Sequence, residues 1–429
     1  MTLQEVIDII HKELAKRDYI GETSPANQEM HQKHCIGTFE AIISGNGNEK
    51  YILPNITSLH FLYRGQNQEV IPCKPSLYRG NPTEEMIFIE RMRFIVFKRL
   101  LHSHPVIRNF FWKHQFKVDE LGLAQHYGLK TEVLDLTSSL DIALFFATCR
   151  YNPTTDSYTY YDDSQEHQGI LYVFLPILDN EPTPSCNPAD FLTQNIRVVG
   201  LQAFPRPGMQ QAYGLHIKQG NSIKCYMYKF SFTSSDSKYY YNLFKCGTTL
   251  WIKDILADKC RIIAQQTDFS FDVFNETFRS FRPKGYSANK LKKRFPSNIH
   301  LLTKHPDLLF NTEEQWEIVN GWNTLIGPKM ASTIYRKRWV ECKEGDTPIA
   351  SEHWHKFRTF ERINQTQWLY LTGAPDPLEG AQWVNYLNTP QSVSKHFQSS
   401  SEWQKIPKSF EDLFGAPYLT EDDWRIEWD

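Results

Sequence analysis

Several sequence signatures of common enzyme and metal-site classes are missing from this chain. Its eight cysteines are scattered and no Cys-x-x-Cys pair is present, so neither a zinc site of the common kind nor a disulfide framework is expected. The Gly-x-x-x-x-Gly-Lys-Ser/Thr loop, the His-Glu-x-x-His helix and the Gly-x-Ser-x-Gly elbow are absent from the sequence as well. These absences argue against a P-loop NTPase, a zincin and a typical α/β-hydrolase, and we predict no metal centre.

Long apolar runs and an excess of charge of one sign are also missing. The longest strongly apolar run, residues 142–147, is far shorter than the ~20 residues that a membrane-spanning helix needs. The first residues include acids and lack the basic start and apolar core of a secretory signal. The formal net charge of −2 gives no overall field that would attract nucleic acid or a membrane surface. We therefore expect a soluble, cytoplasmic protein with no membrane partner.

The hydrophobic periodicity predicts an α+β fold, with a mixed, mostly antiparallel sheet flanked by helices. Helices are expected at about 3–16, 83–101, 117–127, 138–149, 236–246 and 252–264, and strands at 57–63, 133–135, 169–175 and 222–232. Ser138 and Asp141 fit a capping box that opens the buried helix at 138–149. Residues 151–168 lack periodicity and are expected to form an exposed loop.

Length and composition predict more than one domain. A chain of 429 residues is long enough for two or three domains. Nine of the eleven tryptophans lie from Trp316 onward, so the composition changes after about residue 285. We expect an N-terminal helical extension at 1–55, a central domain at 56–270 and a Trp-rich C-terminal region at 285–429. Those tryptophans could form a face that binds a partner protein, although use in a core is more common.

A first group of candidate residues lies in Tyr63-Arg64-Gly65-Gln66. Arg64 offers a planar fork of donors that suits phosphate or carboxylate, and Gly65 lets the backbone approach a ligand closely. Arg79 offers the same fork a few residues later. The structural alternative for each arginine is an ion pair with a buried acid.

A second group of polar residues precedes the most apolar helix-like run of the chain, which is typical of a polar pocket at the rim of a rigid core. It comprises Gln125, His126, Tyr127, Thr131, Asp135, Thr137 and Ser138. His126 could donate to a phosphate, act as a general base or cap carbonyl groups. Tyr127 could stack on a base or pack in the core, and Asp135 could orient His126 or Arg64 or form a turn. Thr137 and Ser138 precede a helix N-terminus, which suits an anion.

A third group lies in the segment 204–214, where Gln210 and Gln211 stand beside Arg206 and a Gly-containing turn. Two amides beside an arginine suit hydrogen bonding to a nucleotide or an amide. An ordinary surface loop is the equally weighted alternative.

These segments together resemble the FRG domain, which is named for its Phe/Tyr-Arg-Gly motif. The resemblance covers roughly residues 56–265 and predicts an FRG domain at 56–270. Its carriers are Phe61-Leu-Tyr-Arg-Gly-Gln66, Pro75-Ser-Leu-Tyr-Arg79, Leu123-Ala-Gln-His-Tyr-Gly-Leu-Lys-Thr131, Leu134-Asp-Leu-Thr137, Ala143-Leu-Phe-Phe-Ala147 and residues 206–211.

The order of the segments is also similar to ADP-ribosyltransferases of the Arg / Ser-Thr-Ser / Glu class. That similarity implies an ADP-ribosyltransferase-like sheet, with Arg64 matching the arginine that binds the NAD phosphate and Thr137-Ser138-Ser139 matching the second element. Gln210 or Gln211 stands where the catalytic glutamate is expected. A neutral amide stabilises a cationic ribose less well than a carboxylate does, so Asp135 and Asp141 are alternative candidates.

The resemblance implies an enzyme that uses NAD to modify a macromolecular acceptor, nucleic acid or protein, in a bacterial toxin or phage-defence role. The alternatives are a non-catalytic module that binds a nucleotide or nucleic acid, and a phosphate-ester hydrolase or nuclease. The predicted catalytic residues are His126, Asp135, Gln210 and Gln211. The predicted NAD-binding residues are Arg64, Gly65, Gln66, Arg79, Gln125, Tyr127, Thr137 and Ser138.

Overall fold

The computed structural model describes residues 1–21, 39–43, 50–54, 61–67, 73–114, 116–174, 196–200, 203–217, 225–283, 285–327 and 419–420. Most of the predicted strand at 57–63 and most of the predicted C-terminal region, including residues 328–418, lie outside these ranges. Among the described residues, no helix combines the length and the apolarity that crossing a membrane requires.

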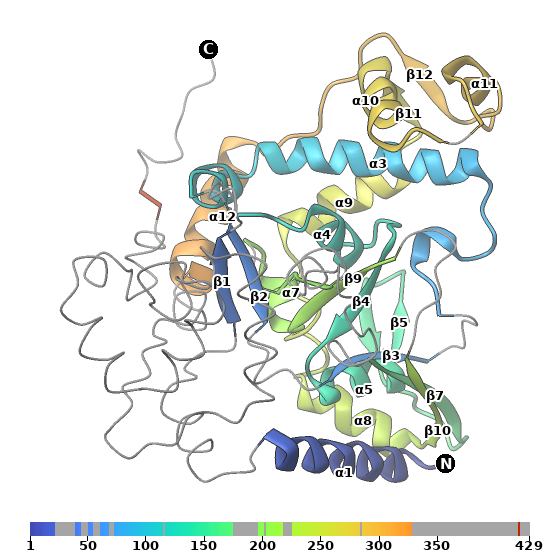
Figure 1. The fold of residues 1–429 in the computed structure, drawn as a ribbon, viewed down its shortest axis with the longest axis vertical. Helices are drawn as coiled ribbons and strands as arrows, with labels where there is room; N and C mark the ends of the chain where they lie inside the picture. The colour runs from blue at the N-terminus through green and yellow to red at the C-terminus, as the bar shows by residue number, and fades with distance from the viewer. Residues whose placement is uncertain are drawn as a thin grey trace, which may run out of the picture.

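A six-stranded sheet forms the centre of the protein (Figure 1). Its strand order is β10-β7-β3-β4-β9-β8, and every neighbouring pair is antiparallel. The strands are β3 (Leu62–Gln66), β4 (Val133–Thr137), β7 (His167–Phe174), β8 (Ile196–Val198), β9 (Ala212–His216) and β10 (Tyr226–Phe232). Helices flank the sheet, so the predicted α+β class with a mostly antiparallel sheet is confirmed.

Shorter strand pairs accompany this sheet in the described part of the chain. They are the antiparallel pairs β1 (Phe39–Ile43) with β2 (Lys50–Pro54) and β5 (Arg150–Asn152) with β6 (Ser157–Thr159), and the parallel pair β11 (Asp268–Ser270) with β12 (His300–Leu302).

Helices precede, separate and follow these strands along the described part of the chain. They are α1 (Leu3–Gly21), α3 (Glu84–His102), α4 (Glu120–His126), α5 (Leu140–Thr148), α7 (Pro205–Met209), α8 (Ser234–Leu243), α9 (Ile255–Gln265), α10 (Phe271–Phe281), α11 (Ala288–Lys292) and α12 (Thr312–Gly321). A 3-10 turn covers Ser76–Tyr78, and π-helical turns cover Ile107–Trp112 and Trp322–Ile326.

One face of the sheet carries α5, with α1 and α8 beside it (Figure 1). Helix α5 is apolar on nearly all sides, which is why it is buried between the sheet and other helices. Its backbone rests directly on β3, because Gly65 has no side chain: a Cβ atom there would lie 1.6 Å from the carbonyl oxygen of Ala143. The glycine of the Tyr-Arg-Gly motif therefore serves helix packing in this fold.

The opposite face carries α4, with α3, α9 and α10 packed outside it. The core on this side joins Leu134 and Tyr213 of the sheet to Phe88 and Phe97 of α3. Residues from beyond 285 enter the same core, among them Leu291, Phe310, Val319 and Trp322. Trp322 is fully buried, so this tryptophan is used for packing.

Two local expectations are corrected by the structure. The side chain that caps α5 is Ser139, which accepts from the backbone N–H of Ile142, and not Ser138. Residues 151–168 are not a plain loop, since β5 and β6 form a hairpin around Asp156, whose φ is 46°. The ring of Tyr158 on this hairpin contacts Phe145 of α5, and this tertiary contact orders a segment that has no periodicity of its own.

His104 is a fully buried histidine that follows α3. Its ring contacts Phe204 and Phe310, and its Nδ1 atom accepts from the N–H of Ile107 at 3.3 Å. The Nε2 atom has no hydrogen-bond partner in the part of the chain that the structure describes. Burial lowers the pKa of His104 to about 3, because the charged ring would lose its hydration in this apolar setting.

We expect Gly65→Ala to destabilise the protein by about 3 kcal/mol or more, since overpacking at a rigid backbone contact forces α5 away from β3. Gly321→Ala, where a Cβ atom meets open space at the end of α12, is the matched control and should be neutral or slightly stabilising. Urea unfolding of both variants measures this. Equal stability of the two would contradict the close α5–β3 contact.

Acid should destabilise the protein through His104. Its ordinary pKa is about 6.5 and its folded pKa about 3, so below pH 6.5 the unfolded state binds a proton that the folded state does not. Stability attributable to this site is therefore complete above pH 6.5 and falls by about 1.4 kcal/mol per pH unit toward pH 3. His104→Asn retains an acceptor for Ile107 and should lose stability less steeply in urea titrations between pH 6.5 and 4.5.

Candidate functional site

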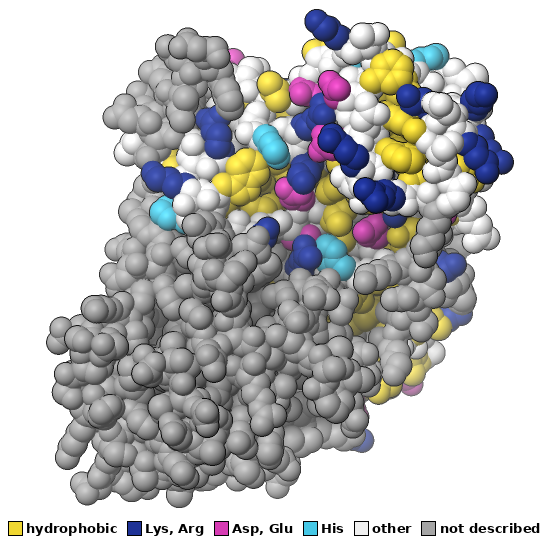
Figure 2. All heavy atoms as spheres, turned by 45° about the horizontal axis from the view of Figure 1, so that its top comes forward, with side chains coloured by type: hydrophobic (Ala, Val, Ile, Leu, Met, Phe, Trp, Pro, Cys, Tyr) yellow, Lys and Arg dark blue, Asp and Glu magenta, His cyan; other side chains and the backbone are white. Residues whose placement is uncertain are grey.

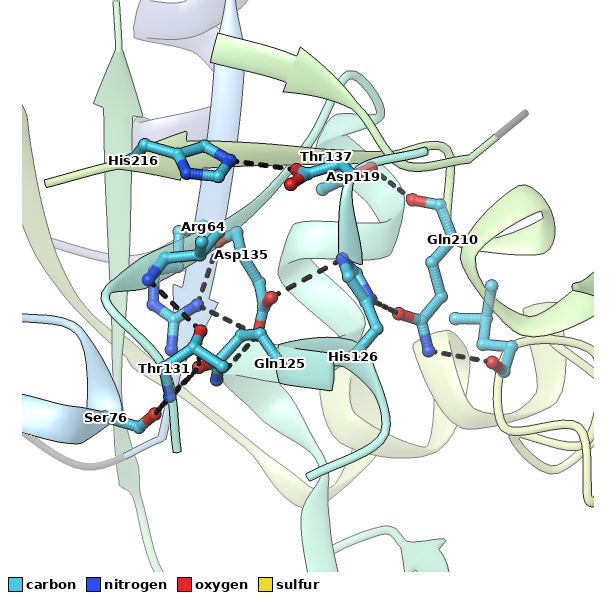
Figure 3. Close-up of polar contacts among 12 residues, drawn as sticks. Arg64, Ser76, Asp119, Gln125, His126, Thr131, Asp135, Thr137, Gln210 and His216 are labelled. Atoms are coloured by element: carbon cyan, nitrogen blue, oxygen red, sulfur yellow. Dashed lines mark hydrogen bonds and ion pairs between the residues drawn. The ribbon is translucent and has the colours of Figure 1, made fainter. Parts of the chain in front are cut away.

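The three candidate segments of the sequence meet on three neighbouring strands. Arg64 lies within β3, Asp135 and Thr137 lie on β4, and Gln210 and Gln211 form the turn that enters β9. The order β3-β4-β9 in the sheet brings these residues together from positions far apart in the chain. Helix α4 adds Gln125 and His126 from its C-terminal end, as Figure 3 shows.

Arg64 and Asp135 are linked across the strand pair. The Nη1 atom of Arg64 donates to the backbone carbonyl of Asp135 at 2.9 Å and lies 3.8 Å from the carboxylate oxygen Oδ2. The Nε atom of Arg64 is buried and has no hydrogen-bond partner among the described residues, and the same holds for the Oε1 atom of Gln66 on the same strand. The contact with Asp135 thus leaves part of the guanidinium group unused.

Arg79 adds a second positive charge to this site. Its Nε atom donates to the carbonyl of Lys74 at 3.0 Å. Burial first, and then the charge of Arg64, lower the pKa of Arg79, which places the two guanidinium groups within electrostatic reach of each other. The same two charges act on the thiol of Cys73, whose pKa is nevertheless raised by burial. Two arginines beside the single carboxylate of Asp135 favour an anionic ligand.

His126 is held between Gln210 and Asp135. The Nε2 atom of Gln210 donates to the carbonyl of Leu250 at 2.9 Å, which turns its Oε1 atom toward the Nδ1 atom of His126 at 3.0 Å. This arrangement assigns the proton of a neutral imidazole to Nδ1. The Nε2 atom then carries a lone pair and faces Oδ1 of Asp135 at 3.5 Å.

When the imidazole is neutral, two acceptor atoms face each other in the middle of the site. Neither His126 Nε2 nor Asp135 Oδ1 has a hydrogen-bond partner among the described residues. A ligand hydroxyl beside this pair could donate to one of the two atoms. Leaving a buried polar group unpaired costs about 1–3 kcal/mol, so such clusters call for an explanation by function.

Gln125 holds Asp135 in place. Its Nε2 atom donates to Oδ2 of Asp135 at 3.4 Å, while its Oε1 atom accepts from Ser76 at 2.7 Å and from the Thr131 hydroxyl at 3.0 Å. Thr131 also receives the backbone N–H of Leu77 on its carbonyl. Ser76 lies in the Pro-Ser-Leu-Tyr-Arg segment, in which the sequence pointed only to Arg79. No motif in the sequence distinguishes Ser76 from other serines.

Thr137 and Ser138 connect the β4–α5 turn to the turn before β9. The hydroxyl of Thr137 donates to the carbonyl of Gln210 at 2.8 Å and receives the N–H of Ser139. Ser138 donates to Oε1 of Gln211 at 3.0 Å on the surface. These hydroxyl groups are thus engaged within the protein, and the two turns are fixed relative to each other.

Tyr127 is buried beneath the site. Its hydroxyl donates to Asp254 Oδ2 at 2.6 Å, and burial, followed by the charge of Asp254, raises its pKa well above the ordinary value. The ring contacts Phe204. This environment corresponds to the core-packing alternative.

Arg206 is a positioning residue that sequence reasoning noted but did not select. Its guanidinium group donates twice to the carbonyl of Ile252, at 3.0 and 2.8 Å, and lies over the rings of Trp251 and Tyr127. It therefore fixes the loop that supplies the Leu250 carbonyl to Gln210. The sequence feature that could have pointed to Arg206 is the Pro-Arg-Pro-Gly turn, which two glutamines follow.

Asp119 anchors the other end of α4. It is buried at the start of the helix and contacts His216 of β9 at 2.9 Å and Arg197 of β8 at 3.6 Å. Burial acts to raise the pKa of Asp119, but the charge and the hydrogen bond of His216 outweigh it and hold the pKa below its ordinary value. In the described part of the chain, no group of three or more His, Cys, Asp or Glu side chains is arranged to hold a metal ion.

A comparison with known protein families assigns one region of the chain to a family. Residues 59–156 match the model of the FRG domain, so the chain carries an FRG domain. The match includes Arg64, His126 and Asp135 and ends before Gln210. No curated protein and no solved structure matches the chain.

Substitution of the two adjacent glutamines should lower the stability of the protein by very different amounts. Gln210→Leu leaves His126 Nδ1 and the Leu250 carbonyl unpaired and should cost about 1–3 kcal/mol of stability. Gln211→Leu removes only the exposed hydrogen bond with Ser138 and should cost well under half as much. Urea unfolding compares the two, and nitrogen chemical shifts of His126 report its tautomer. A Gln210→Leu protein that keeps the proton on Nδ1 would contradict the assignment.

Proposed function

We propose that this FRG-domain protein is an ADP-ribosyltransferase-like enzyme that binds NAD and transfers ADP-ribose to a macromolecule. The observation that carries the proposal is a set of buried polar atoms without hydrogen-bond partners on neighbouring elements of the site. They are Arg64 Nε, Gln66 Oε1, His126 Nε2 and Asp135 Oδ1. A polar ligand that pairs with these atoms gains binding energy that no internal contact of the described residues supplies.

The chemistry of these groups fits a nucleotide. Arg64 and Arg79 offer guanidinium donors for a diphosphate, which they bind through charge-assisted hydrogen bonds. His126 and Asp135 offer two neighbouring acceptors for a ribose hydroxyl. Phosphate and ribose are adjacent in any nucleotide, so one ligand would satisfy both halves of the site.

The transfer step assigns separate roles to Asp135 and His126. NAD would supply the ADP-ribosyl group, with the electron pair of the broken glycosidic bond leaving on nicotinamide. Asp135 would stabilise the positive charge that develops on the ribose, since a fixed carboxylate in a partly buried site acts strongly on such charge. His126 would accept at Nε2 the proton that the attacking group of the acceptor loses.

Asp135 is a better candidate for the catalytic carboxylate than Gln210, Gln211 or Asp141. Both polar atoms of the Gln210 amide are engaged, by His126 and by the Leu250 carbonyl. Gln211 is exposed and accepts from Ser138, and Asp141 is exposed on α5. We therefore propose that a carboxylate on β4 has the role that the catalytic glutamate has in the transferases.

A non-catalytic nucleotide-binding module is the second candidate. The observation that favours it is the same buried amide, Gln210, in the position where the transferases are expected to carry a glutamate. The same donors and acceptors would then hold a nucleotide without breaking its glycosidic bond. The toxin or phage-defence role, the acceptor and the cytoplasmic location remain predictions of the sequence.

The paired variants Asp135→Asn and Asp141→Asn test the transferase. Purified protein is incubated with adenine-labelled NAD and cell extract, and label in macromolecules is followed with time. Removing the charge at Asp135 should lower the transfer rate by about 10²–10³-fold, by analogy with the loss of one preorganised electrostatic group. Asp141→Asn should transfer label as the wild type does, because that carboxylate faces solvent.

Arg64→Ala separates binding from chemistry. This variant should lose both label transfer and NAD affinity, measured by calorimetry, whereas Asp135→Asn should keep most of the affinity. Digestion with nuclease or protease then names the acceptor class. Arg64-dependent NAD binding with no label and no nicotinamide release would favour the binding module, and the absence of any nucleotide binding would contradict both candidates.

A further inference from the structure

A basic surface is formed by α10, α11 and β12, away from the central site. Seven Lys and Arg residues of the described part of 271–305 contribute to it, namely Arg279, Arg282, Lys290, Lys292, Lys293, Arg294 and Lys304. The same range contains two acidic residues, Asp272 and Glu276. Figure 2 shows dark blue side chains gathered at the upper right of the molecule, the corner that these elements occupy in Figure 1. A chain with a net charge of −2 thus concentrates positive charge locally.

Most of these cations are not neutralised by the protein. Arg279, Arg282, Lys290, Lys293 and Lys304 are exposed, and none of them forms an ion pair with a described acidic residue. Glu276, one of the two acidic residues nearby, forms an ion pair with Arg99 of α3, with 2.8 Å between Oε2 of Glu276 and Nη2 of Arg99. Arg294 is the paired member, since it contacts Glu85 at 3.0 Å.

The surface is held rigidly on the body of the protein. Leu291 of α11 is fully buried, and Ser287 caps that short helix by accepting from the N–H of Lys290. Two rings steady the ammonium groups: Lys292 lies 4.7 Å from the ring centre of Phe271, and Lys290 lies 5.3 Å from that of Tyr286. Cations whose positions are restrained in this way lose less entropy when they bind an anion.

We propose that the α10–α11–β12 surface binds the phosphodiester backbone of nucleic acid. Lysine and arginine side chains without acidic partners are the groups that neutralise phosphates, and each contact releases condensed counterions. Phe271 is exposed beside Lys292, and an aromatic ring next to basic groups is a position where an unpaired base can stack. This inference does not depend on the proposed transferase, because it uses none of the residues of the central site.

The double variant Lys290→Gln/Lys293→Gln tests this surface in the full-length protein. Fluorescence anisotropy is measured with a labelled RNA, the same sequence as single-stranded DNA, and a DNA duplex, over a range of salt concentrations. Losing two phosphate contacts should weaken binding about tenfold or more near 0.1 M salt and lower the slope of log K against log salt by about 1.4–1.8. Comparison of the three probes shows which nucleic acid is preferred.

Two controls keep the result interpretable. Lys12→Gln/Lys238→Gln removes two exposed lysines from α1 and α8 and should bind as the wild type does. Lys290→Arg/Lys293→Arg keeps the charge and should retain binding. Unchanged binding by the Lys290→Gln/Lys293→Gln protein, or an equal loss in the Lys12/Lys238 pair, would overturn the proposal. Competition by polyglutamate as strong as that by RNA at equal charge would also overturn it, in favour of an acidic protein partner.

The experiments can contradict the proposal for the central site and the proposal for the basic surface independently of each other. Arg64→Ala should keep its affinity for nucleic acid, and Lys290→Gln/Lys293→Gln should keep its affinity for NAD. If the protein binds RNA but not NAD, the result would support nucleic-acid binding by the basic surface and contradict the proposed transferase.

Discussion

The direct contact between the backbones of α5 and β3 is the constraint on which the site depends. It requires the absence of a side chain at Gly65, whose Cβ position is filled by the Ala143 carbonyl. The contact fixes α5 on the sheet, and the pairing of Thr137 with Ala212 sets the turn from β4 into α5 beside the turn into β9. Thr137 then holds the carbonyl of Gln210 at 2.8 Å, and Gln210 in turn orients His126. The helix contact on one face and the strand pairing within the sheet together hold the polar groups of the site in place.

The polar residues of the site divide into those that are satisfied and those that are not. Gln125 and Gln210 use both ends of their amides within the protein and hold Asp135 and His126 in place. Among the described residues, the side-chain atoms without a hydrogen-bond partner include atoms of Arg64, Gln66, His126 and Asp135, and Oδ1 of Asp119. Such a division is what a preorganised binding site requires, since rigid neighbours keep the unpaired groups from pairing with one another.

Charge is organised on a local scale in this protein. The net charge of −2 predicts no attraction to nucleic acid, and that inference from composition is sound for the chain as a whole. The fold nevertheless gathers lysines and arginines of α10, α11 and β12 on one surface, and brings Arg64 and Arg79 together inside the central site. Electrostatic recognition depends on the field near a surface, which falls off within about 10 Å at 0.1 M salt, and not on the total charge.

The sequence by itself determined the features that a few neighbouring residues encode. These include the start of α3, where Thr83 accepts from the N–H of Met86, the burial of the apolar helix α5, and the motifs that select Arg64 and His126. Only the tertiary structure decided that Gln210 orients His126 from 84 positions away, that Gly65 faces a helix, and that residues 150–159 form a hairpin. Helix caps and periodicity act over one or two turns. Hydrogen-bond partners in a sheet depend on which distant strands lie side by side, and that is settled only when the whole core packs.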